Sequence, residues 1–171
     1  HLLRRQIHRE FRKPLVVFSP KMLLRYPKAV STIEELAEGG FQEVLDDDVT
    51  KNKVDTVVLC SGKFYYDAKA EAEERGVTNA AFIRVEQMYP FPEKQLSAVL
   101  KTYKKATNTI WAQEEPENMG PWRYMAMAMR DKNLDVVARP SSAAQAAGSS
   151  ATHKKRLGEL FDNLFSKIAG K

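Results

Sequence analysis

The sequence predicts an α/β fold, a three-layer α/β/α sandwich around a Rossmann-like, mostly parallel sheet. Short apolar runs alternate with amphipathic helical patterns, so that strand–helix–strand units recur along the chain. The length of 171 residues fits one domain, and 43% hydrophobic with 29% charged residues is an ordinary globular composition. Consecutive units of this kind place helices on both faces of a parallel sheet.

The first third of the chain has the weakest pattern. The apolar run Leu15–Phe18, which Ser19 and Pro20 end, predicts a strand. Between residues 20 and 53 the sequence favours a short helix near Ser31–Glu38, closed by two glycines, and a strand at Phe41–Leu45.

The later elements follow more clearly from their patterns. Gly76 stops one helix, Pro92 opens the next with Glu93 in its first turn, and Ser149 or Ser150 is expected to cap the last. The predicted strands are Val54–Cys60, Ala80–Val85, Thr109–Gln113 and Leu134–Ala138; the predicted helices are Phe64–Arg75, one from Pro92 through Tyr103, Pro121–Arg130, and a last one with Leu157, Leu160, Phe161, Leu164, Phe165 and Ile168 on one face.

Positive charge is concentrated at the N-terminal end. Residues 1–28 hold eight basic side chains and one acidic one, Glu10, whereas the remaining 143 residues carry 19 basic and 21 acidic groups. One interpretation is a basic arm that binds nucleic acid, but only Phe11 and Phe18 could stack on bases there. The favoured interpretation is a segment that faces an acidic neighbouring domain or a phosphate-bearing ligand.

Several classes of protein are excluded. No uncharged apolar run approaches the ~20 residues of a membrane span. The single cysteine, Cys60, ends an apolar strand and is expected to be an inert buried thiol. His1, His8 and His153 have no spacing that suggests a metal site. Because the chain opens in the middle of a helical pattern, we take it as a piece of a longer protein.

The turns after the strands contain little catalytic chemistry. Ser61-Gly62-Lys63 is similar to the end of a phosphate loop, but Val57 stands where that loop needs glycine and Phe64 where it needs Ser or Thr. There is no GxGxxG motif either. The sequence therefore does not favour a nucleotide site in this chain.

The turn at residues 113–122 is rich in carboxylates. Consecutive residues of an extended chain point to opposite sides, so Glu114 and Glu115 are not expected to share a proton. Acid–base catalysis remains one interpretation of this turn. The favoured one is a structural turn, with Asn118 or Gly120 as helix cap and Pro121 as first helical residue; Trp122, Met125 and Met129 then fill the core.

The chain resembles the C-terminal domain of 2-oxoglutarate dehydrogenase E1. The similar blocks come in family order over nearly the whole chain: HLLRRQ, KPLVVFSPKMLLR, SGKFYYD, RVEQMYPFP, WAQEEPENMGPW and RPSSAAQAAGSS. The resemblance implies a transketolase C-terminal-type fold with a five-stranded mixed sheet, in which Leu15–Phe18 is the candidate antiparallel strand. It also implies that residues 1–13 are the tail of a pyrimidine-binding domain plus a linker, and residues 14–171 the domain itself.

The family reaction is oxidative decarboxylation of 2-oxoglutarate, an oxidoreductase step of the tricarboxylic acid cycle, with transfer of the succinyl group to lipoyl on E2 dihydrolipoyl succinyltransferase. Thiamine diphosphate and Mg²⁺ are bound by upstream domains, so no catalytic, cofactor-binding or metal-binding residue is expected here and the fragment alone is predicted inactive. The implied partners are the upstream E1 domains, an E1 homodimer and E2, with no nucleic acid or membrane. The implied compartment is bacterial cytoplasm or mitochondrial matrix.

The resemblance also suggests an allosteric acetyl-CoA site. Its candidate contacts are Arg5, Gln87 and Lys94, whereas Gly40, Glu43 and Gln95 stand where the family's actinobacterial branch has Lys, Ser and Arg. Losing cations and gaining a carboxylate weakens binding of a polyanion. The alternative is that Arg5 and Gln87 only hold an interdomain junction.

Three further readings remain open. They are the matching domain of a 2-oxoadipate dehydrogenase E1, a stand-alone α/β module for a small molecule or nucleotide, and a basic-arm nucleic-acid binder. The E1 reading differs from the last two because it predicts exposed apolar surface where neighbouring domains are missing.

Overall fold

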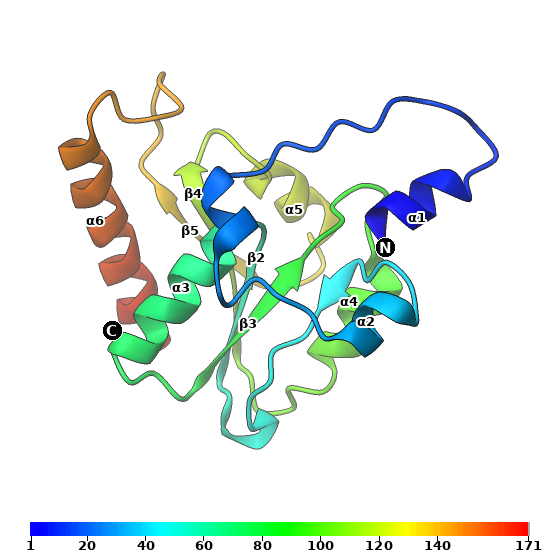
Figure 1. Cartoon of the computed structure of the whole chain (residues 1–171). Helices are drawn as coiled ribbons and strands as arrows, with labels where there is room; N and C mark the ends of the chain where they lie inside the picture. The colour runs from blue at the N-terminus through cyan, green and yellow to red at the C-terminus, as the bar shows by residue number, and fades with distance from the viewer. Residues whose placement is uncertain (171) are drawn as a thin grey trace. The chain divides into compact units, whose positions relative to one another are not determined.

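One five-stranded sheet forms the centre of the molecule. The structure is a computed structural model that describes residues 1–170. The strand order is β1-β3-β2-β4-β5 (Figure 1), with β1 antiparallel to β3 and all other neighbours parallel. The strands are β1 (Val44–Leu45), β2 (Thr56–Cys60), β3 (Ala80–Val85), β4 (Asn108–Pro116) and β5 (Leu134–Arg139). The predicted mostly parallel sheet with one antiparallel strand is confirmed.

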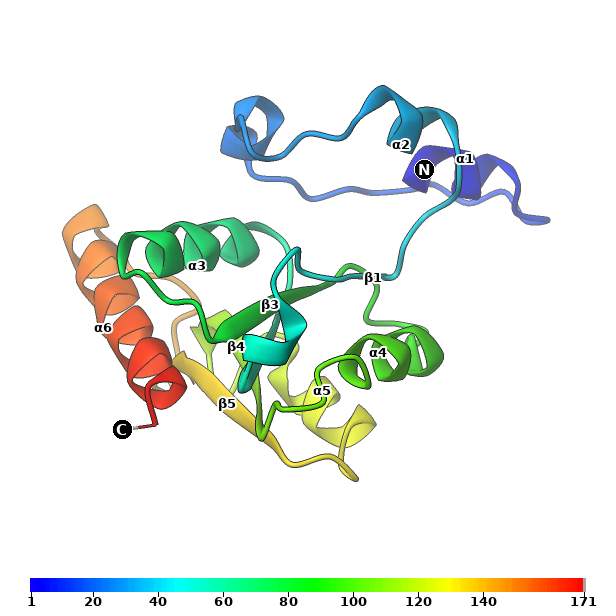
Figure 2. The ribbon, with the colours of Figure 1, turned by 90° about the horizontal axis from the view of Figure 1, so that it is seen from below.

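Helices cover both faces of this sheet, as Figure 2 shows. The helices α3 (Lys63–Glu74) and α6 (Ser150–Ile168) pack on one face, and α4 (Glu93–Leu100) and α5 (Trp122–Ala128) on the other. Side chains alternate along each strand, so Val58 faces α3 and α6 while Val57 faces the opposite layer. The three-layer sandwich is therefore confirmed.

The antiparallel strand is not the one expected. Leu15–Phe18 belongs to no strand of the sheet, and Val44–Leu45 takes the antiparallel position, with Val44 paired to Val85. Val44 is buried, and the carbonyl of the preceding Glu43 accepts hydrogen bonds from the backbone of residues 86 and 87. Burial of Val44 and the backbone hydrogen bonds next to it hold β1 in place. The apolar side chains of Leu15–Phe18, in contrast, are exposed.

Helix termini follow the sequence closely, with one correction. Ser149 caps α6 by accepting a hydrogen bond from the Thr152 amide at 3.2 Å, and Gly76 follows α3 with φ of +66°. Pro121 is the cap residue of α5, not its first helical residue, so neither Asn118 nor Gly120 caps the helix. A glutamine side chain described below supplies the missing acceptor.

The chain divides into two compact units, residues 1–42 and residues 43–171. The first unit contains α1 (Leu2–Ile7), a 3₁₀ turn η1 (Lys21–Arg25) and α2 (Ile33–Ala37); the second also contains a 3₁₀ turn η2 (Lys51–Lys53). Arg4 of α1 donates to the carbonyls of Leu36 and Ala37 at the end of α2, where a cation complements the helix dipole. The expected domain boundary at residues 13/14 stays a prediction.

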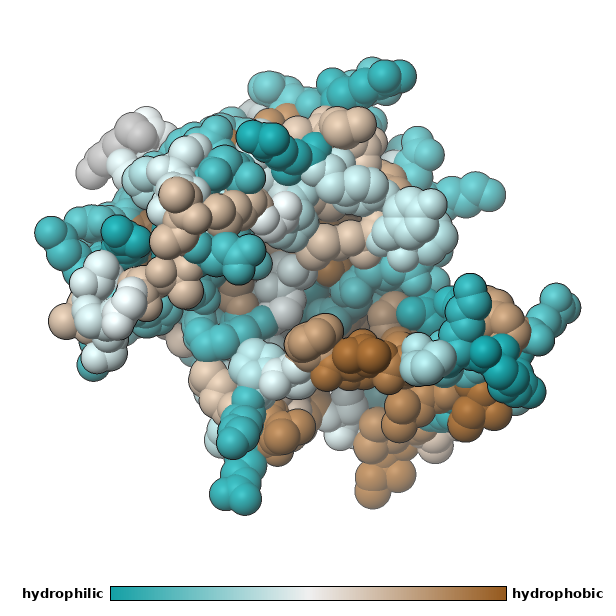
Figure 3. Space-filling view, turned by 90° about the horizontal axis from the view of Figure 1, so that it is seen from above, coloured by the Kyte–Doolittle hydropathy of each residue, from teal (hydrophilic) through white to brown (hydrophobic). Residues whose placement is uncertain are grey.

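Apolar surface is exposed mainly in residues 1–42, none of which is buried. Figure 3 shows strongly apolar side chains, in brown, at the surface. The large apolar side chains that are exposed in the first unit are Leu3, Ile7, Phe11, Leu15, Val16, Val17, Phe18, Met22, Leu24, Val30, Ile33 and Leu36, whereas within residues 43–170 they are Tyr89 and Met127. The structure thus exposes apolar surface, and the prediction that neighbouring domains cover it stays a prediction. No helix within residues 1–170 is long and apolar enough to cross a membrane.

Candidate functional site

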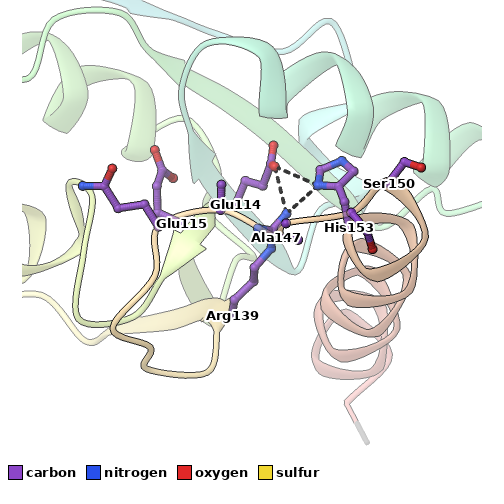
Figure 4. A pocket seen from close by; sticks show the side chains of 10 residues that line it. Glu114, Glu115, Arg139, Ala147, Ser150 and His153 are labelled. Carbon is purple, nitrogen blue, oxygen red and sulfur yellow. Dashed lines mark hydrogen bonds and ion pairs between the residues drawn. The ribbon is translucent and has the colours of Figure 1, made fainter.

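A hollow of about 440 Å³ lies at the carboxyl ends of β4 and β5, beside the first turn of α6 (Figure 4). Ligands of open α/β sheets bind at this edge. We call it the Arg139 hollow; its lining is Glu114, Glu115, Arg139, Gln145, Ala146, Ala147, Gly148, Ser149, Ser150 and His153.

Arg139, the last residue of β5, organises the hollow. Its side chain is 6% exposed, and its Nη2 donates to Glu114 Oε1 at 2.8 Å and lies 3.2 Å from His153 Nδ1. The His153 Nδ1 is 3.7 Å from the same carboxylate oxygen. A buried guanidinium needs such partners, because an unpaired buried charge is costly. The three side chains therefore fasten α6 to the ends of two strands.

The network offers no nucleophile for catalysis. Ser149 Oγ donates to Thr152 Oγ1 at 2.9 Å, and Ser150 lies on the side of His153 away from Glu114 (Figure 4). Acyl-transfer chemistry requires a nucleophile hydrogen-bonded to its base. The geometry within residues 1–170 thus supports a structural role for the hollow.

The residues present also do not fit a thiamine diphosphate–magnesium site. No group of three His, Cys, Asp or Glu side chains within residues 1–170 is arranged to hold a metal ion. Gly62 is the N-cap residue of α3 with φ of +58°, but Lys63, the cation of the Ser61-Gly62-Lys63 turn, forms an ion pair with Asp67 on its own helix. We therefore place no thiamine diphosphate–magnesium site on these residues.

The carboxylate-rich turn is built around one buried amide, that of Gln113. Its Oε1 accepts from Trp111 Nε1 at 2.8 Å and from the Trp122 backbone N–H at 2.9 Å, at the start of α5. Its Nε2 donates to the Met119 carbonyl at 2.8 Å and the Pro116 carbonyl at 3.2 Å. Gln113 thus caps α5 and closes the turn, which supports the structural interpretation of this motif.

The two neighbouring carboxylates of the turn have separate surroundings. Glu114 pairs with Arg139, whereas Glu115 lies against Gly120, where an added Cβ would be 3.0 Å from the Glu115 Cβ. Gly120 has φ of +65°, a conformation that side chains disfavour. Each carboxylate therefore has its own neighbours, as the extended backbone predicts.

Sequence reasoning missed Arg139 and His153. His153 was noted only for its lack of metal spacing, and it lies 39 positions after Glu114. The signal that could have found the pair is positional: Arg139 ends a strand that is parallel to β4, so both strands present their last residues at one edge.

Among the candidate effector contacts and the positions that depart from the family pattern, Glu43 contacts both Gln87 and Gln95. The Gln87 backbone N–H donates to the Glu43 carbonyl at 3.1 Å, and Gln95 Nε2 donates to Glu43 Oε2 at 3.4 Å, so these three residues cluster beside β1. Lys94 is exposed in the first turn of α4. Arg5 belongs to the first unit, where its guanidinium lies 3.7 Å from the centre of the Phe41 ring.

The core predictions for other single residues are confirmed. Cys60 is fully buried, and burial raises the pKa of its thiol far above the usual range. Met125 and Met129 are buried in the layer formed by α4 and α5, with Trp122 packed against them.

Comparison with solved structures places the fold among transketolase-like domains. The chain is similar to "Split gene transketolase, inactive beta4 tetramer", with a TM-score of 0.51, 12% identity, and coverage of 76% of this chain and 43% of that one. A family model described as 2-oxoglutarate dehydrogenase C-terminal matches residues 30–165. The chain belongs to this family of 2-oxoglutarate dehydrogenase C-terminal domains.

Relatives of two kinds match nearly the whole chain. The 2-oxoglutarate dehydrogenase E1 component of Cupriavidus necator is 44% identical over 99% of this chain, and the 2-oxoadipate dehydrogenase complex component E1 of Mus musculus is 42% identical over 98%. The chain spans 19% of the length of each. The relatives include a bacterial and a mammalian protein.

Proposed function

We propose that this chain is the non-catalytic C-terminal domain of a full-length E1 subunit that oxidatively decarboxylates 2-oxoglutarate and passes the succinyl group to lipoyl on E2. The observation that carries the proposal is the family match over residues 30–165. It is supported by the Arg139 hollow, in which Arg139 pairs with Glu114 and the Ser149 hydroxyl donates to Thr152. Thiamine diphosphate supplies the electron sink of the reaction and is held by residues outside this chain.

The role of the domain itself is to form interdomain and homodimer contacts. Twelve large apolar side chains of residues 1–42 are exposed, and residues 1–28 carry a net charge of +7. Exposed apolar surface of this extent is typical of protein interfaces. The basic charge suits an acidic neighbouring surface.

The first experiment is to measure the size of the natural gene product with an antibody raised against residues 43–170. A product several times heavier than 19.4 kDa supports the proposal. A product near 19.4 kDa contradicts it and favours a stand-alone α/β module, which saturable nucleotide binding would then identify.

The second candidate substrate is 2-oxoadipate, because a relative named for that substrate is 42% identical. The immunopurified natural protein should be assayed with 2-oxoglutarate and 2-oxoadipate side by side, with and without thiamine diphosphate and Mg²⁺. Higher kcat/KM for 2-oxoglutarate supports the proposal, and higher kcat/KM for 2-oxoadipate supports the alternative. Cell fractionation of the source distinguishes bacterial cytoplasm from mitochondrial matrix.

Regulation by acetyl-CoA is a separate part of the proposal. Gln95 hydrogen-bonds Glu43, so that both side chains already have a partner at the place where a phosphate needs cations. In the full-length enzyme, Lys94→Ala should weaken any activation by acetyl-CoA, whereas Lys101→Ala at the other end of α4 should not. No activation of the unmodified enzyme would mean that Arg5, Gln87 and Lys94 serve the domain junction alone.

A further inference from the structure

Residues 15–18 form an extended apolar segment that belongs to no sheet in this chain. Leu15, Val16, Val17 and Phe18 are 38%, 70%, 57% and 95% exposed. Within residues 1–170 none of their backbone groups has a hydrogen-bond partner in a strand or turn. Residues 15–18 therefore have the sequence pattern of a strand but not the backbone hydrogen bonds to a neighbouring strand.

An exposed apolar segment with strand-forming residues is expected to need a partner strand and a covering layer. Val, Leu and Phe in a row favour strand conformation, and backbone N–H and C=O groups that leave water need partners. Both faces of the segment are apolar, because Leu15 and Val17 point to one side of an extended chain and Val16 and Phe18 to the other. Strands that are apolar on both faces are typical of sheets covered by helices on each side.

The flanking residues set the length of the segment. Pro14 and Pro20 bracket it, and neither can donate a ladder hydrogen bond. Five amide donors therefore lie between them, on residues 15–19, which is the usual length of a short strand. The six basic residues 9, 12, 13, 21, 25 and 28 surround it, so the apolar stretch itself is uncharged.

We infer that residues 15–18 are a strand of a second, helix-covered sheet, formed by the part of the full-length E1 protein outside these 171 residues. The inference rests on the proposed function and names the partner of its exposed surface. The E1 relatives are about five times as long as this chain, since it spans 19% of them. A sheet in the same polypeptide is present at high effective concentration, whereas pairing with a second copy depends on protein concentration.

Hydrogen–deuterium exchange tests the inference on the full-length natural protein and on the 171-residue chain. The amides of residues 15–18 should exchange ~100-fold or more slowly in the full-length protein, because ladder hydrogen bonds must open first. Fast exchange of these amides in both proteins overturns the inference. Protection in the 171-residue chain that rises with its concentration also overturns it, since the partner is then a second copy.

Proline substitution supplies a second, independent test. Val17→Pro removes one ladder donor and should lower the melting temperature of the full-length protein by several degrees, while leaving the 171-residue chain unchanged. Ser31→Pro is the matched control, because Ser31 is an exposed polar residue outside the segment and outside the apolar surface of residues 1–42. Equal effects of Val17→Pro on both proteins, or equal effects of the two variants on the full-length protein, contradict the inference.

The failure of the proposed function is recognisable separately. A natural product near 19.4 kDa overturns both the E1 assignment and this inference. A heavy natural product whose residues 15–18 exchange fast leaves the E1 assignment intact and overturns only the second sheet.

Discussion

Residues 43–170 bury most of their large apolar side chains, whereas residues 1–42 leave theirs exposed. The larger unit places its apolar residues on both faces of the sheet, where two clusters form under α3 and α6 and under α4 and α5. The smaller unit has no buried residue, although its apolar side chains are as large. Its helices α1 and α2 have six and five residues, too short to be stable without packing.

The two units differ in whether they bury their own apolar side chains. A layered sheet with both faces covered satisfies its own backbone and side chains, and the larger unit has this arrangement. In the smaller unit, Arg4 of α1 donates to backbone carbonyls at the end of α2, a cation lies over an aromatic ring, and the Thr32–Glu35 capping box closes the start of α2. The exposed apolar residues of the smaller unit are the surface that the proposed function assigns to interdomain and homodimer contacts.

The largest expected effect is a cavity in the larger unit. Leu164 is fully buried on α6, and Leu164→Ala should lower the free energy of unfolding by about 2–5 kcal/mol. Phe18→Ala in the smaller unit should change it by less than about 0.5 kcal/mol in the 171-residue chain, since Phe18 is 95% exposed. Urea unfolding followed by circular dichroism measures both, and similar losses would remove the contrast between the units.

Gln113 tests whether a single amide holds the turn between β4 and α5. Gln113→Ala leaves the Trp111 indole N–H and the Trp122 amide without their acceptor, which should cost about 2–4 kcal/mol. Gln145→Ala is the control, because Gln145 is exposed in the adjacent loop. A Gln113→Ala variant as stable as the control in the same urea titration would show that water replaces the amide.

The Arg139 hollow gives a smaller, graded effect. Glu114→Ala leaves a buried guanidinium without its carboxylate and should cost about 1–3 kcal/mol, discounted because Glu114 itself is 31% exposed. His153→Ala should cost less than about 1 kcal/mol, since it leaves the Arg139–Glu114 pair in place. The melting temperatures of the two variants give their order of stability. A larger loss of stability for His153→Ala would mean that the histidine contributes more to holding α6 than the carboxylate does.

The sequence predicted the parts of the fold that depend on local pattern. The β3 bounds Ala80–Val85 match, and Ser149 caps α6 as expected, because these features follow from the order of neighbouring residues. Leu15–Phe18 was wrongly paired, since an apolar run predicts a strand but not the sheet to which it belongs. Arg139 and His153 were missed because the fold, not sequence proximity, brings them to Glu114.

The smallest expected effect is a pH dependence of stability that arises from Asp46 in the larger unit. Asp46 is partly exposed; burial raises its pKa, but hydrogen bonds from Lys51 and Tyr103 more than offset this and lower it below the ordinary value of 3.8. A lowered pKa in the folded state contributes stability that is present above the unfolded pKa and is lost as the pH falls through the folded pKa.

Asp46→Asn should therefore reduce the stability of the 171-residue chain near neutral pH by less than about 1 kcal/mol, and the difference from the unmodified chain should vanish in strong acid. Urea midpoints measured from pH 7 down to pH 2 give the comparison, with the exposed neighbour Asp48→Asn as control. A constant difference across this range would mean that the amide loses packing and not charge. Because Asp46 forms an ion pair with Lys51 of η2 and accepts a hydrogen bond from Tyr103 after α4, a pH-dependent loss would show that these contacts stabilise this edge of the sheet.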